Sequence, residues 1–139
     1  MKRFLLTLLV AALLGVLTPS YGGSLPTLAA QQKRAETVLW FEQKQFQLDQ
    51  ITMTIKVLRA KDMKEKTAWG AMELHSNGPY IEILAEDDYE PAMTVKERKH
   101  QLDEIVVHEL LHVLMIQQGV PHDAQDSIIE AIRPGVKLP

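Results

Sequence analysis

The chain has 139 residues, of which 46% are hydrophobic and 24% charged, with no cysteine and a formal net charge of −3. These values are typical of one globular domain, and the lack of cysteine excludes stabilisation by disulfide bonds. The mild acidity, without a basic patch, argues against nucleic acid as a partner.

The N-terminal residues have the layout of a secretory signal peptide. Two basic residues precede an apolar run of 14 residues, Phe4 to Leu17, and small and polar residues follow it. We predict that residues 1–22 are the signal and that residues 23–139 form the mature domain, with cleavage near Ala29 as an alternative. The apolar run is shorter than the roughly 20 residues that span a membrane, so we expect export, periplasmic or secreted, without a stable membrane span. A membrane anchor formed by the uncleaved segment is the alternative.

One helix and one strand are expected at the start of the domain. Residues 28–47 are rich in good helix formers, and their apolar side chains fall roughly on one face, which predicts a helix that covers a sheet. A strand through residues 37–41 is the alternative there. Residues 51–58 alternate apolar with polar or small side chains at period two, which indicates a strand with one buried face.

A hairpin is expected next. Residues 67–75 and 80–85 are two further strand candidates, and Asn77-Gly78 between them is a strong turn signal, because both residues tolerate positive φ. Three strands therefore precede the helical half of the chain. The acidic residues that follow, 85–92, are expected to form a solvated surface loop rather than a metal site.

Two helices are expected in the C-terminal part. Thr94 and Glu97 match a capping box, so a long helix should begin directly after Thr94, and Gly119 followed by a proline supplies its stop. Residues 124–133 predict the last helix, which Asp123 can cap. The predicted fold class is α+β, with an N-terminal helix packed on a small three-stranded sheet, then a long helix and a C-terminal helix.

The long helix contains the sequence His108-Glu109-Leu110-Leu111-His112. On an α-helix, histidines at i and i+4 lie about 40° apart around the axis, and Glu109 lies about 100° from His108, so all three side chains leave one face. Two imidazoles suit Zn²⁺ as ligands, and the adjacent carboxylate can take a proton from a water that the metal activates. Because this helix is apolar nearly all round, polar groups on it need partners. A chance HExxH on an ordinary buried helix is the alternative.

A catalytic zinc site takes three protein ligands and leaves the fourth position to water. Glu130 is the preferred third ligand, because it is the one polar residue among 128–132 and its apolar neighbours predict that it projects towards the HExxH helix. His122 and Asp126 are the alternatives.

The HExxH helix, the three strands before it and the following helix with Glu130 resemble the zincin metallopeptidases. The likeness is to the gluzincin branch, in particular to small single-domain members of bacteria and phages. It rests on His108, Glu109, His112 and Glu130, and over residues 28–133 it otherwise concerns only the order of elements. The metzincin branch is excluded, since the residues at its next Gly and His positions are methionine and glutamine here.

The resemblance implies a zinc cofactor with His108, His112 and Glu130 as ligands and Glu109 as general base. Gluzincins also carry an Asp four residues after the ligand Glu, where this chain has a proline, and Asp126 is the residue that could replace that Asp in supporting a histidine ligand.

The resemblance also implies a substrate-binding mode. In zincins the substrate lies extended along an edge strand, and either arm of the hairpin at residues 67–85 is a candidate for that edge. The oxyanion helper of the family is commonly a tyrosine or histidine, and His75, Tyr80 and Tyr89 are available here. We therefore expect an exported zinc-dependent metallopeptidase acting on peptides or proteins. The alternative is a non-catalytic, zinc-stabilised secreted domain that binds a protein partner.

Overall fold

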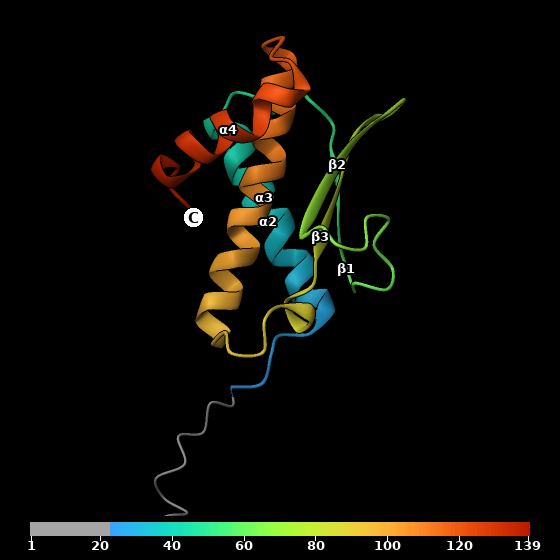
Figure 1. Cartoon of the computed structure of the whole chain (residues 1–139), viewed down its shortest axis with the longest axis vertical. Helices are drawn as coiled ribbons and strands as arrows, with labels where there is room; N and C mark the ends of the chain where they lie inside the picture. The colour runs from blue at the N-terminus through green and yellow to red at the C-terminus, as the bar shows by residue number, and fades with distance from the viewer. Residues whose placement is uncertain (1–22) are drawn as a thin grey trace, which may run out of the picture.

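The computed structural model describes residues 23–139 (Figure 1). The predicted signal peptide, residues 1–22, lies outside the described residues. Within residues 23–139, every helix is too short or too polar to cross a membrane.

The chain forms two layers, a small sheet and a group of helices packed on one of its faces (Figure 1). In chain order the elements are α2 (Leu28–Gln45), β1 (Thr54–Leu58), β2 (Gly70–His75), β3 (Gly78–Leu84), the 3-10 turn η1 (Glu86–Asp88), α3 (Val95–Gln117), α4 (His122–Ile132) and the 3-10 turn η2 (Arg133–Gly135). The predicted α+β layout, with an N-terminal helix, a three-stranded sheet and two C-terminal helices, is confirmed.

The sheet is mixed, with the strand order β1-β3-β2. The central strand β3 pairs in parallel with β1 and antiparallel with β2, so that Ile81 lies between Ile55 and Met72. The predicted hairpin is confirmed, and its turn requires glycine at position 78. Gly78 has φ +116°, and a Cβ there would lie 2.2 Å from the carbonyl oxygen of Thr52. In the strand order β1-β3-β2, strand β2 pairs with β3 on one side only, so within the described chain it is an edge strand with one unpaired side.

Helix α2 covers the sheet as predicted, and the alternative of a strand through residues 37–41 is wrong. Its buried face includes Ala35 and Val38, whereas Trp40 is 59% exposed. Arg34 on this helix donates two hydrogen bonds to the carboxylate of Asp103 on α3, at 2.9 and 2.6 Å. Because Asp103 is buried, this bidentate ion pair fixes α2 against the helix that carries the HExxH motif.

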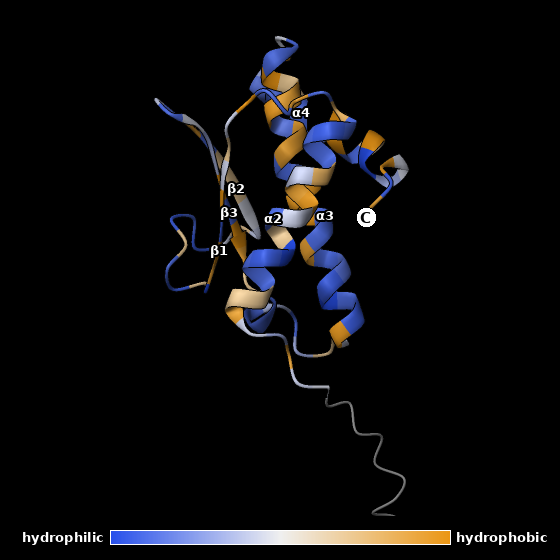
Figure 2. Ribbon diagram, turned by 180° about the vertical axis from the view of Figure 1, so that it is seen from behind, coloured by the Kyte–Doolittle hydropathy of each residue, from blue (hydrophilic) through white to orange (hydrophobic). Residues whose placement is uncertain are grey.

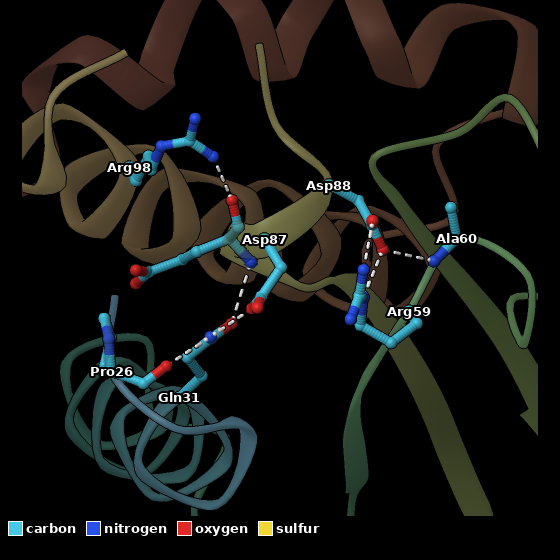
Figure 3. Close-up of polar contacts among 8 residues, drawn as sticks. Pro26, Gln31, Arg59, Ala60, Asp87, Asp88 and Arg98 are labelled. Carbon is cyan, nitrogen blue, oxygen red and sulfur yellow. Dashed lines mark hydrogen bonds and ion pairs between the residues drawn. The ribbon is translucent and has the colours of Figure 1, made fainter. Parts of the chain in front are cut away.

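The acidic segment after β3 forms a structural junction (Figure 3). The prediction of a solvated loop over residues 85–92 holds for its exposed residues, such as Glu90, and is wrong for the buried Glu86. Glu86 is 2% exposed, and its main-chain N–H donates to the side chain of Gln31 at 2.8 Å. The same Gln31 donates to Asp87 at 2.8 Å. Asp88 accepts from Arg59 at 2.8 and 2.9 Å, and this guanidinium lowers the pKa of Asp88 to about 2. The segment joins α2 to the loop that follows β1.

Helix α3 begins as predicted. The Thr94 side chain accepts from the Glu97 N–H at 3.2 Å, and the Glu97 carboxylate accepts from the Thr94 N–H at 2.7 Å. The first turns of α3 are polar and its middle is apolar (Figure 2). Gly119 with φ +72° ends the helix. The predicted cap of α4 at Asp123 is wrong: this tight turn starts α4 two residues earlier, at His122, with Pro121 at the N-cap position.

Candidate metal centre

The candidate site lies where α4 crosses the C-terminal half of α3 (Figure 1). Each helix contributes two side chains four residues apart, which therefore lie on one face. Helix α3 provides His108 and His112, whose ring centroids are 5.0 Å apart, and α4 provides Asp126 and Glu130. The local structure thus brings two imidazoles and two carboxylates together from segments that are separate in the sequence.

Three of these side chains form a compact donor set. Within residues 23–139, one nitrogen of His108, one of His112 and one oxygen of Asp126 lie within 4.8 Å of one another. Asp126 Oδ1 is 3.3 Å from His112 Nε2 and 3.8 Å from His108 Nε2. Tetrahedral zinc with bonds of about 2.0–2.2 Å holds its ligand atoms about 3.3–3.6 Å apart. The 3.3 Å separation falls within this range and the 3.8 Å separation is longer, and two imidazole nitrogens with one carboxylate oxygen are donor types that zinc accepts.

Gln125 fixes the protonation of His112. The Gln125 side-chain N–H donates to the carbonyl of Val120 at 3.0 Å, so its oxygen is the atom that faces His112 Nδ1 at 2.9 Å. That oxygen only accepts, so Nδ1 must carry the proton. In the neutral ring Nε2 then directs a lone pair at the Asp126 carboxylate. Two electron-rich atoms in contact need a proton or a metal ion between them, so this contact is compatible with a metal ion here.

The two nitrogens of His108 face two different carboxylates. Nε2 faces Asp126, and Nδ1 lies 3.4 Å from Oε1 of Glu130. Burial of the ring, followed by its neighbour His112, lowers the pKa of His108 and so favours the neutral form that binds metals. A carboxylate at Nδ1 with a metal ligand position at Nε2 is the usual arrangement of a ligating histidine.

This arrangement bears on the choice of third ligand. Asp126 faces Nε2 of both histidines, whereas Glu130 lies at the opposite nitrogen, Nδ1, of His108. Exposure does not separate the two candidates, because the side chain of Asp126 is 74% exposed and that of Glu130 is 55% exposed. One ion cannot be bound through both nitrogens of one ring. The assignment of Glu130 as a ligand stays a prediction, and the geometry favours Asp126 in that role, with Glu130 as support for His108. His122 is not a member of the set of three.

Glu109 lies beside the donor set, between α3 and the edge strand. It is 6% exposed, and its carboxylate packs against Gly70 at the start of β2, where a Cβ would lie 2.6 Å from Oε1. Burial raises the pKa of Glu109 to about 8, with smaller contributions from the negative charges of Asp126 and Glu65. A dication nearby would oppose this shift and favour the charged carboxylate.

Two cavities meet at Glu109. Both are lined by Gly70, His108 and Glu109, and their volumes are about 250 and 440 Å³. The smaller extends towards Trp69 and is polar at its far end, and the larger runs along β2 beside the donor set. Together they form an open cleft between the edge strand and α3 that leads past the candidate base.

The three predicted oxyanion helpers lie away from this cleft. His75 and Tyr80 stack on each other at 5.0 Å between ring centroids, and Tyr89 is buried behind Trp69, with its ring stacked at 5.3 Å. None of the three lines either cavity. Their role as oxyanion helpers stays a prediction without geometric support.

Sequence patterns missed two residues of the site. Gln125 is almost fully buried together with Ile129, which lies four residues later, so an apolar face of α4 contains one amide. That spacing was a usable signal for a polar group aimed at α3. No comparable signal marks Gly70, whose need for a hydrogen side chain depends on how close β2 approaches α3.

Comparisons with known proteins found no matching family model, no matching curated protein and no matching solved structure. The resemblance to zincins therefore rests on the motif and on the arrangement described above. It remains a prediction about family membership.

Proposed function

We propose that this chain is a zinc-dependent metallopeptidase that cleaves peptide bonds in extended segments. The observation that supports it most strongly is the convergence of His108, His112 and Asp126 into a set of three ligand atoms within 4.8 Å, directly beside the buried Glu109. Three protein ligands with a position left for water are typical of catalytic zinc, whereas structural zinc sites are closed by four. When bound, the ion would supply Lewis-acid activation of a water and of the peptide carbonyl.

Glu109 is the proposed general base. It accepts the proton of the attacking water and then delivers it to the nitrogen of the leaving amine, so it ends the reaction in its starting state. The low exposure of this carboxyl keeps bulk water from competing for the proton. Asp126, His108 and His112 hold the ion, while Gln125 and Glu130 keep the two imidazoles in the required tautomer and orientation.

The edge strand β2 is the proposed substrate platform. Trp69 accepts a main-chain hydrogen bond from Leu84 at 2.8 Å, and bonded pairs alternate along an antiparallel ladder. The main-chain groups of Gly70, Met72 and Leu74 therefore point away from β3, towards the unpaired side. An extended peptide can add to this side as a further strand, and the large cavity runs along the same residues. Of the two hairpin arms, β2 is the one that fits the predicted role.

Export is part of the proposal and rests on residues 1–22 alone. An uncleaved segment would place the same domain at a membrane surface.

The test is a digest of a peptide library by the mature domain, with and without chelator, beside metal analysis of the purified protein. The variant Glu109→Gln should retain one zinc ion and lose peptide hydrolysis by a factor on the order of 10² or more. Cleavage by this variant at the parental rate would refute the assignment of the base. If the parent binds zinc and is stabilised by it but cleaves no peptide, the non-catalytic zinc-stabilised domain is the better account.

A further inference from the structure

A chain of ion pairs lies behind His108, on the side away from Asp126. Arg133, the first residue after α4, donates from Nη1 to Glu104 at 2.9 Å and from Nη2 to Glu130 at 3.0 Å. The other oxygen of Glu130 lies 3.4 Å from Nδ1 of His108. One guanidinium therefore connects a carboxylate of α3 with the carboxylate that faces the histidine.

Contact with His108 alone would not hold Glu130 in place. Its side chain is 55% exposed, and 3.4 Å is longer than a well-formed hydrogen bond between an imidazole N–H and a carboxylate. Exposed carboxylates on a helix surface sample several rotamers unless a partner fixes them. Arg133 is better suited to that task, because its own side chain is only 22% exposed.

Glu104 anchors Arg133 to the helix that bears the metal ligands. It precedes His108 by four residues, so the two side chains leave the same face of α3. The position of Glu130 is thereby set relative to α3 itself, rather than only to α4. A planar guanidinium can bond both carboxylates at once in a fixed geometry, which the point charge of lysine cannot reproduce.

We propose that Arg133 is a positioning residue of the metal site: held by Glu104, it fixes Glu130 against Nδ1 of His108 and so keeps Nε2 directed at the ion. This inference rests on the proposed metal-dependent function. It concerns how tightly and in what geometry the ion is held, and Arg133 itself touches neither the ion nor the substrate.

The test measures metal binding by the whole mature domain. The chelator-treated protein is titrated with Zn²⁺ in competition with a chromophoric chelator, and with Co²⁺ followed by its visible absorption spectrum. The variants are Arg133→Met, Arg133→Lys and Glu104→Met. Arg59→Met serves as the matched control, because Arg59 also bridges to a carboxylate but in the junction after β3. Thermal melting of the metal-free forms reports any general loss of stability.

Arg133→Met should weaken Zn²⁺ binding on the order of 10-fold or more and change the Co²⁺ spectrum, because loss of an outer partner typically costs 10- to 100-fold in affinity. Arg133→Lys should recover only part of this loss of affinity. The control Arg59→Met should bind Zn²⁺ as tightly as the parent does. A purely structural role would lower the melting temperature of the metal-free protein but leave the Co²⁺ spectrum unchanged, which would overturn the inference.

The outcomes separate the two proposals. If the parent binds Zn²⁺ and Arg133→Met binds it equally tightly, the positioning role is refuted while the metal site stands. If the parent binds no Zn²⁺, the proposed function fails and this inference fails with it. Should Arg133→Met not fold, Glu104→Met removes the anchor on α3, and parental affinity in that variant would overturn the inference in the same way.

Discussion

Replacement of Gly70 by alanine should separate catalysis from metal binding. A Cβ at this position would lie 2.6 Å from Oε1 of Glu109, 2.9 Å from its Cγ and 2.6 Å from Cγ2 of Ile105. Ile105 is buried in the core, so it can give way only with a shift of α3 or β2. The carboxyl end of Glu109 can rotate away more easily. The cheapest response to the added methyl group is therefore to displace the candidate base.

Gly70→Ala is expected to have a moderate effect on stability and a large effect on activity. Overpacking of a tight contact typically costs about 1–3 kcal/mol of folding free energy. A displacement of a catalytic group by about 1 Å can cost on the order of 10²-fold in rate. The three atoms nearest to the added methyl group belong to Glu109 and Ile105 and not to the proposed ligands, so the zinc content of Gly70→Ala should equal that of the parent.

Three measurements on one preparation test this expectation: the rate of peptide hydrolysis, the zinc content, and unfolding by denaturant. Gly135→Ala is the matched control, because a Cβ there meets no atom within 4 Å. A Gly70→Ala protein that folds and cleaves peptide at the parental rate would refute the close packing of Glu109 on β2 as a requirement for catalysis.

Two other substitutions test the metal and the core. His112→Ala should abolish zinc binding, and chelator should then no longer lower the melting temperature. In the parent and in the exposed-residue control His100→Ala, chelator is expected to lower it. Burial raises the pKa of Glu42 from 4.5 to about 7 and leaves both carboxylate oxygens without a partner. The folded chain thus binds this proton more tightly than the unfolded chain, so stability should fall as pH rises from 4.5 to 7. Glu42→Gln should raise the melting temperature at pH 8 but not at pH 4.5, and equal pH profiles for Glu42→Gln and the parent would contradict this.

The elements could be predicted from the sequence because their signals are local. The capping box at Thr94 and the turn at Gly78 each depend on contacts within a few residues, apart from the approach of Thr52 to the turn. The N-cap of α4 was misplaced for a related reason. Asp123 has the side chain of a good cap, but Gly119 in the left-handed region turns the chain so that the helix begins before it.

The acidic segment after β3 illustrates a different limit. Its charges alone indicated a solvated loop, yet Glu86 is buried and Asp88 is paired with Arg59. The partners come from α2 and from the loop after β1, which are far away in the sequence (Figure 3). Charge patterning cannot reveal such long-range partners, because it describes a stretch of chain and not what packs against it.

The third ligand depends on the crossing of α3 and α4, which no local pattern fixes. Asp126 and Glu130 lie one turn apart on the same face of α4, so each had the spacing required to meet the histidines. A displacement of α4 by about one turn along its axis, about 5.4 Å, would bring Glu130 to the place of Asp126. The buried pair Gln125 and Ile129 sets the actual position, because Gln125 bonds His112 while Ile129 fills the core. Asp126 then faces both imidazole Nε2 atoms, and Glu130 falls at the outer nitrogen of His108, where Arg133 holds it.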